Sequence, residues 1–201
     1  ALGDAGVGLV EVSDLVLEKI CDTKTPQGVV AVVSQLDVSL EELLASKPQL
    51  IALLDQARDP GNAGTVLRAA DAAGANGVIF TTGSVDAYNP KVVRSTAGSI
   101  LHVPFVLNAD SAQAVSRLKA SGMQVLAASA NGTPITDLGS KLEKPTVWIF
   151  GNEAHGVSPE LLEMADEVVS LPIYGQAESL NLATAASVCL YASAFQLFSQ
   201  H

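Results

Sequence analysis

The chain has 201 residues, of which 48% are hydrophobic and 4% aromatic, so it can bury one substantial core with a small appendage. A formal charge of −10 excludes a uniformly basic nucleic-acid-binding surface, and any contact with a polyanion must rest on a local patch. The start shows no signal-peptide pattern, and no apolar run is long and uninterrupted enough to span a membrane, which predicts a cytoplasmic protein without membrane contact.

Residues 1–49 carry few secondary-structure signals. An apolar pattern predicts a short helix over residues 13–21, and a β-branched run predicts a strand over residues 28–33. Ser39-Leu40-Glu41-Glu42 is a capping-box pattern that predicts a short helix to about Ala45, followed by a linker. These elements are too few for an independent domain, so the region either packs on the larger body or belongs to a larger unit.

From Leu50 onward, strands and helices alternate with short connections. The strands are largely apolar, which is typical of parallel strands covered on both faces. We therefore predict an α/β fold with a mainly parallel sheet and helices on both faces. The expected strands are residues 50–54, 77–80, 102–107, 123–128, 146–150 and 168–171, and the expected helices are residues 62–73, 89–97, 111–121, one opening at Ser158, and 181–198.

The first polar loop, DQARDPGNAG, follows the strand that begins at Leu50. It lacks both the Walker ending and the dinucleotide glycine fingerprint, which argues against a Rossmann-like nucleotide-dependent oxidoreductase. Its glycines favour a tight turn, and Asn62 is placed to cap the next helix. Arg68 lies farther along, among small and apolar residues, and needs a partner: a salt bridge to Asp71 or Asp59, or a ligand.

The second polar loop, FGNEAHGVS, contains Gly151, which allows a ligand to approach closely, and Glu153, which supplies a carboxylate. His155 has the ordinary pKa range of a catalytic base, but we expect it to shape the loop. Its spacing from Glu153 is too short for a helical metal pair and no third ligand is near, so no metal is expected.

The third polar loop lies within residues 171–187, between a strand and the last helix, where an α/β protein usually binds its ligand. Four hydrogen-bonding side chains fall within six residues: Gln176, Glu178, Ser179 and Asn181. Capping of the helix by Ser179 or Asn181 would explain either residue alone.

In this order, DPGNAGTVLRAADAAG, IFGNEAHGVS and LPIYGQAESLNLATAAS resemble motifs one, two and three of the SpoU/TrmH family of RNA ribose 2′-O-methyltransferases, in the SPOUT superfamily. The resemblance covers about residues 50–198. It implies a C-terminal deep trefoil knot, S-adenosylmethionine as cofactor, and a homodimer. Residues 1–45 then resemble the remnant of an N-terminal RNA-substrate-binding domain with its linker, and residues 46–201 form the catalytic domain.

The resemblance also assigns site residues. Cofactor contacts fall on Ser129, Ala130, Gly151, Leu171, Ile173, Leu180 and Leu182, and catalytic roles fall on Asn62, Arg68, Glu153, Ser179 and Asn181. We expect Arg68 to grip phosphate and stabilise the developing alkoxide, because a guanidinium with a pKa above about 12 is a poor proton acceptor. Glu153 would hold Asn62 or Arg68, while Ser179 and Asn181 would orient cofactor and ribose.

The expected substrate is structured RNA, either ribosomal RNA, which we prefer, or transfer RNA. Candidate basic contacts are Lys19, Lys24, Arg58, Lys91 and Arg94. A non-catalytic RNA-binding module of the same fold is the alternative, although such a module would not need Arg68, Glu153, Ser179 and Asn181 together.

Overall fold

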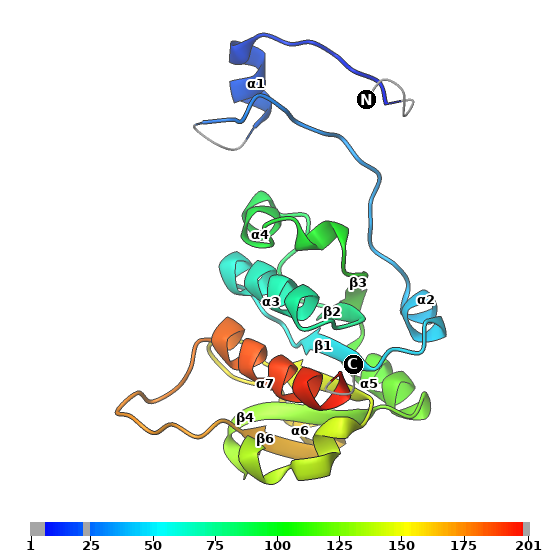
Figure 1. Cartoon of the computed structure of the whole chain (residues 1–201), viewed down its shortest axis with the longest axis vertical. Coiled ribbons are helices and arrows are strands. Elements are labelled where there is room, and N and C mark those ends of the chain that lie inside the picture. Colours follow the sequence, from blue (N-terminus) through cyan, green and yellow to red (C-terminus); the bar gives the residue numbers. More distant parts are fainter. Residues whose placement is uncertain (1–6, 22–24, 199–201) are drawn as a thin grey trace. The chain divides into compact units, whose positions relative to one another are not determined.

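The computed structural model describes residues 7–21 and 25–198 (Figure 1). The chain divides into two compact units, Ala1–Gln35 and Leu36–His201. In the first unit, the predicted helix is confirmed as α1 (Asp14–Ile20), but the strand predicted over residues 28–33 is wrong. No described strand pairs with this segment, and Val32 is 98% exposed. A β-branched run without a partner cannot satisfy its backbone groups as a strand does.

The second unit is built on a parallel sheet. Its described residues form six strands in the order β3-β2-β1-β5-β4-β6, and each neighbouring pair is parallel. The strands are β1 (Leu50–Leu54), β2 (Gly77–Thr81), β3 (Phe105–Ala109), β4 (Gln124–Pro134), β5 (Thr146–Phe150) and β6 (Glu167–Ser170). The predicted fold class is therefore confirmed, while the trefoil knot stays a prediction.

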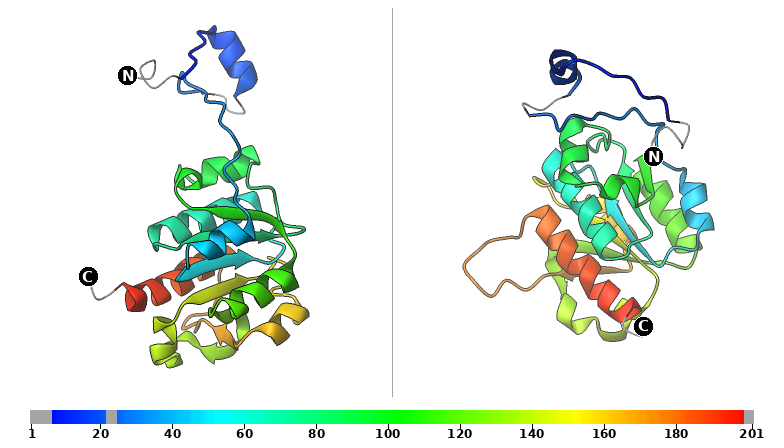
Figure 2. Two further views of the ribbon diagram at one scale, coloured as in Figure 1. Left: turned by 90° about the vertical axis from the view of Figure 1, so that its right-hand side faces the viewer. Right: turned by 45° about the horizontal axis from the view of Figure 1, so that its top comes forward.

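Helices cover both faces of this sheet, as the left view of Figure 2 shows. The helices are α2 (Leu40–Ala45), α3 (Pro60–Ala72), α4 (Pro90–Ser95), α5 (Ser111–Ala120), α6 (Pro159–Met164) and α7 (Leu182–Leu197), with 3₁₀ turns at Ser99–Leu101, Ile135–Asp137 and Gly139–Glu143. Helices α3, α4 and α7 pack on one face, and α2, α5 and α6 pack on the other.

The alternation of side chains along β1 explains how one strand serves two cores. Leu50, Ala52 and Leu54 belong to the core under α3 and α7, whereas Ile51 and Leu53 belong to the core under α5 and α6. All five side chains are fully buried, because successive residues of a strand point to opposite faces.

Two predicted strand boundaries are wrong. The third strand begins at Phe105 and not at residue 102, because residues 99–101 form a 3₁₀ turn and His102 N–H donates to the Ser99 carbonyl at 3.0 Å. Proline at position 104 has no N–H to give to a strand ladder. The fourth strand runs on to Pro134, since its register against β6 shifts between Ala128 and Thr133 and pairing resumes afterwards.

Helix α2 lies with the second unit. The predicted capping box is confirmed, because the Ser39 hydroxyl accepts from Glu42 N–H and the Glu42 carboxylate accepts from Ser39 N–H at 2.7 Å. Leu43 of α2 packs so closely on β2 that a Cβ on Gly77 would stand 2.6 Å from its side chain. Whether residues 1–45 descend from an RNA-binding domain stays a prediction.

The long helix α7 is fastened to the sheet through a buried polar contact. The indole N–H of Trp148 in β5 donates to the Ser193 hydroxyl at 2.9 Å, and both side chains are fully buried. An indole N–H buried without an acceptor would cost roughly 1–3 kcal/mol, so this bond fixes which face of α7 meets the sheet. The second half of α7 is thereby held on the sheet.

Candidate active site

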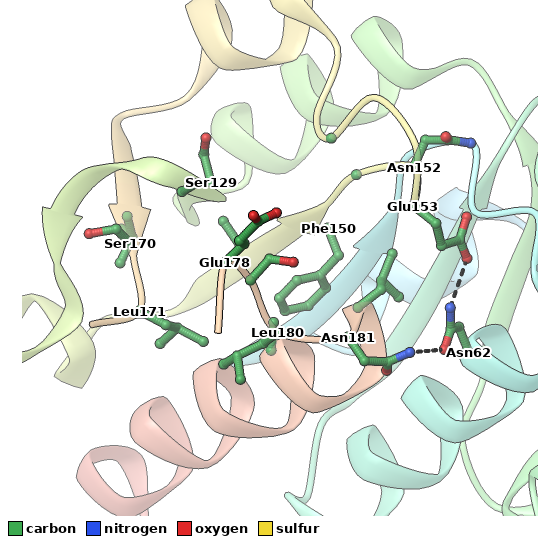
Figure 3. Close-up of a pocket in the computed structure, with 18 of the residues that line it drawn as sticks. Asn62, Ser129, Phe150, Asn152, Glu153, Ser170, Leu171, Glu178, Leu180 and Asn181 are labelled. Atoms are coloured by element: carbon green, nitrogen blue, oxygen red, sulfur yellow. Dashed lines mark hydrogen bonds between the residues drawn. The ribbon is translucent and has the colours of Figure 1, made fainter. Parts of the chain in front are cut away.

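A pocket of about 1110 Å³ opens at the carboxyl ends of β5 and β6 and the middle of β4, beside the start of α7 (Figure 3). Every residue predicted for the site lines it except Arg68. These residues are Asn62, Ser129, Ala130, Gly151, Glu153, Leu171, Ile173, Ser179, Leu180, Asn181 and Leu182. The structure thus brings together side chains from all three polar loops and from Ser129 and Ala130 in the middle of β4.

A row of hydrogen bonds joins the three loops in the pocket, as the dashed lines of Figure 3 show. The amide nitrogen of Asn62 donates to the Glu153 carboxylate at 3.1 Å, and the amide nitrogen of Asn181 donates to the Asn62 amide oxygen at 2.8 Å. Because an ionised carboxylate only accepts, it fixes the orientation of both amides along the row.

The far end of the row caps helix α7. The amide oxygen of Asn181 accepts from the N–H groups of Ala183 at 2.9 Å and Thr184 at 3.3 Å. The predicted capping role therefore belongs to Asn181 and not to Ser179. Its amide nitrogen is left to the pocket, so the same residue caps the helix and belongs to the row.

The near end of the row is held by the backbone of the first loop. The Glu153 carboxylate accepts from the N–H groups of Arg58 at 3.1 Å and Asp59 at 3.2 Å. Burial alone would raise the pKa of Glu153, but these bonds, its own N–H and the Asn62 amide together lower the pKa below the ordinary glutamate value. Glu153 is therefore an ionised anchor at neutral pH and has no proton to give.

The cap of helix α3 differs from the prediction. Asp59, and not Asn62, is the N-cap residue, and its carboxylate accepts from Asn62 N–H at 2.7 Å. The helix begins at Pro60, which suits the first turn because its missing N–H would be unpaired there. Asn62 already lies inside the helix, and its side chain is consequently available to Glu153.

The turn of the second loop closes on itself. Asn152 and Gly156 exchange backbone hydrogen bonds of 2.9 and 2.8 Å, and the Asn152 amide donates to the Gln56 carbonyl at 2.7 Å. A Cβ on Gly151 would stand 1.9 Å from the Gly156 carbonyl carbon, which no side chain can tolerate. Glycine at 151 is thus required by the loop's own backbone, and not only by an approaching ligand as predicted. His155 lines the pocket on this turn.

Arg68 lies apart from the row. It is exposed on α3, and within the described residues it forms no ion pair. The salt bridges considered for it are wrong, because Asp59 caps α3 and Asp71 bonds His102 at 3.0 Å. Hydrogen bonds from Ser99 and His102 lower the pKa of Asp71. Glu153 consequently holds Asn62 and not Arg68.

Other lining residues were not assigned in advance. Phe150 closes β5 under the pocket, Ser170 ends β6, and Glu178 lies two residues before the assigned Leu180. The sequence signals that could have identified them are the positions of Phe150 and Ser170 at the ends of apolar strands and of Glu178 inside the third motif. Within the part of the chain described, no group of three or more metal-binding side chains occurs, and no helix is long and apolar enough to cross a membrane.

Comparison with known proteins decides the family. The model of the SpoU rRNA methylase family matches residues 49–191 of this sequence. The chain belongs to this family. Membership confirms the resemblance drawn from the three motifs, and with it the fold class, the enzyme class of RNA ribose 2′-O-methyltransferases, and S-adenosylmethionine as the cofactor.

Individual relatives of this SpoU methylase are similar over nearly its whole length. The 23S rRNA (guanosine(2553)-2′-O)-methyltransferase RlmP of Bacillus subtilis is 38% identical over 94% of this chain and 73% of its own. The 23S rRNA (uridine(2479)-2′-O)-methyltransferase of Streptomyces viridochromogenes is 34% identical over 92% of this chain and 66% of its own. This sequence therefore spans only part of the length of these relatives.

A solved structure agrees. The AdoMet-bound rRNA methyltransferase from Sinorhizobium meliloti has a TM-score of 0.85 at 33% identity, covering 92% of this chain and 71% of that protein. This likeness supports the fold of a SpoU methyltransferase over nearly all of the chain.

The lowered pKa of Glu153 gives a test of the row. In Glu153→Gln the side chain keeps its shape but cannot ionise, so we expect the wild type to be more stable at pH 7. A depressed folded-state pKa means that this advantage is full above the unfolded pKa of about 4.3 and is lost as the pH falls through the folded value. Urea unfolding of both proteins between pH 7 and pH 3 measures it. A difference that does not change with pH would contradict the assignment.

Proposed function

We propose that this chain transfers the methyl group of S-adenosylmethionine to a ribose 2′-hydroxyl of ribosomal RNA. One observation carries the proposal: the row from Glu153 through Asn62 to Asn181 joins three loops in one pocket of a SpoU-family chain. The named relatives act on 23S rRNA, which favours ribosomal over transfer RNA. Such a substrate also agrees with a cytoplasmic protein.

The pocket fits the cofactor chemically. Its third loop offers aliphatic side chains at Leu171, Ile173, Leu180 and Leu182, which suit the faces of an adenine ring. Ser129 and Ala130, which lie in β4 where its pairing with β6 is interrupted, and Gly151 would bring backbone groups to the ring's edge. When bound, S-adenosylmethionine supplies a methyl group that its positive sulfur already activates.

The protein then has to place the 2′-hydroxyl and stabilise the oxygen as its proton leaves. The amides of Asn62 and Asn181 each use one N–H within the row and keep a second for a ligand. Because Glu153 fixes both amides, these donors stand oriented before the RNA arrives. Ser179, on the same loop as Asn181, would assist in orienting cofactor and ribose.

Arg68 is proposed to meet the RNA from outside the pocket. Its exposed guanidinium has no ion pair among the described residues, so nothing competes with an incoming phosphate. A guanidinium donates two parallel hydrogen bonds to phosphate and can stabilise a developing alkoxide, but it does not accept a proton. Arg58 beside the pocket and Lys91 and Arg94 on α4 are exposed and would extend the contact, while Lys24 lies outside the described residues.

Replacing Arg68 tests this role. In Arg68→Ala we expect methyl transfer to ribosomal RNA to fall by about 100-fold or more, as when a group that stabilises an oxyanion is removed. Calorimetric affinity for S-adenosylmethionine should be nearly unchanged, because Arg68 does not line the pocket. Lys144→Ala removes one positive charge just before β5, at the amino ends of the strands and away from the pocket, and serves as the control. Unchanged transfer by Arg68→Ala would sink the assignment.

The homodimer implied by the resemblance has a candidate surface on α7. The exposed face of this helix carries an apolar stripe at helical spacing, formed by Val188, Tyr191, Phe195 and Phe198. Phe195 is 65% exposed and rests on the Tyr191 ring at a centroid distance of 5.5 Å. Such a stripe suits burial against a second copy of the chain.

Phe195→Glu should therefore shift the protein from dimer to monomer, because a carboxylate in an apolar interface is costly to desolvate. Sedimentation velocity would show the mass of the main species reduced to about half. The control is Ser116→Glu, which places the same charge at an exposed position of α5. If the two variants sediment alike, the interface lies elsewhere.

A further inference from the structure

The pocket carries negative charge without a matching positive side chain. Asp59, Glu153 and Glu178 line it, whereas no lysine or arginine of the described residues does. The other titratable group in the lining is His155. A pocket with this balance favours a cationic ligand.

Two of the three carboxylates are already engaged by the protein. Asp59 accepts from Asn62 N–H at 2.7 Å, and Glu153 accepts from two backbone N–H groups and the Asn62 amide. Glu178 differs, because within the described chain it forms neither a hydrogen bond nor an ion pair. In the view of Figure 3 it lies between Ser129 and Phe150, among the residues that line the pocket.

We propose that Glu178 makes the pocket prefer the methyl donor S-adenosylmethionine over the demethylated product S-adenosylhomocysteine. The inference rests on the proposed function, since it takes the pocket as the cofactor site. The two ligands share the adenosine, the ammonium and the carboxylate, and they differ by one methyl group and one positive charge on sulfur. An unpaired carboxylate in the pocket therefore stabilises the donor more than the product.

Glu178 is better placed for this role than Asp59 or Glu153. The charge of Glu153 is spread over three donors that point at it, and that of Asp59 faces the amino end of α3. Glu178 gives up no internal bond when it turns to a ligand, and no donor already offsets its charge. By favouring the charged donor, it would let fresh donor compete more effectively with the product for the site after transfer.

The test is a comparison of affinities and does not depend on activity. Titration calorimetry of the full chain gives the dissociation constants of S-adenosylmethionine and S-adenosylhomocysteine, and hence their ratio. In Glu178→Gln we expect donor binding to weaken by about fivefold, the size of an exposed ion pair, with product binding almost unchanged. Sinefungin has an ammonium group in place of the methylsulfonium, so its binding should weaken by about the same factor as that of the donor.

Glu163→Gln is the matched control, because Glu163 is an exposed residue of α6 outside the pocket and the change removes one negative charge. The proposal is overturned if Glu178→Gln weakens donor and product equally, which would place the carboxylate on the shared ammonium group. It is also overturned if the ratio stays as in the wild type or changes equally in Glu163→Gln. Failure of the unchanged protein to bind either ligand would overturn the proposed function itself, a result distinct from an unaltered ratio.

Discussion

The site depends on one constraint: a single ionised carboxylate sets the direction of every hydrogen bond in the row that joins the three loops. Glu153 is separated from Asn62 by 91 positions and Asn62 from Asn181 by 119, so no local preference could orient these side chains. Because Glu153 accepts from the Arg58 and Asp59 backbone, it orients the Asn62 amide. That amide in turn orients Asn181 at the start of α7. The amide donors in the pocket are therefore oriented before any ligand binds, and oriented donors stabilise a developing charge at little reorganisation cost.

The fold supplies the proximity that this row requires. Parallel strands bring their carboxyl ends to one edge of a sheet, so the loops after β1, β5 and β6 meet although they are distant in sequence. The indole of Trp148 bonded to Ser193 holds α7 on the sheet, and the turn around Gly151 packs backbone against backbone. Each feature restricts the conformation or position of an element that carries part of the row. Membership of the SpoU rRNA methylase family connects this arrangement with methyl transfer.

Much of this was predictable from the sequence, for physical reasons. Apolar strands such as β1 have to be covered on both faces, and the resemblance carried by three long motifs assigned site residues that all line the pocket except Arg68. Two of the failures depended on partners distant in sequence. Residues 28–33 have strand composition but no neighbouring strand, and the cap of α3 passed to Asp59 while Asn62 turned to Glu153. At Gly151 the sequence suggests close approach by a ligand, and the structure adds a local reason for glycine, since a side chain there would meet the Gly156 backbone.

Methyl transfer from this pocket to a ribose oxygen of ribosomal RNA can be measured directly. The most direct measurement incubates the chain with ribosomal RNA and S-adenosylmethionine labelled in its methyl group, then digests the RNA to nucleosides and separates them. We expect the label to be recovered in one 2′-O-methylated nucleoside. Label on a base, or no label in RNA although calorimetry shows the cofactor bound, would contradict it.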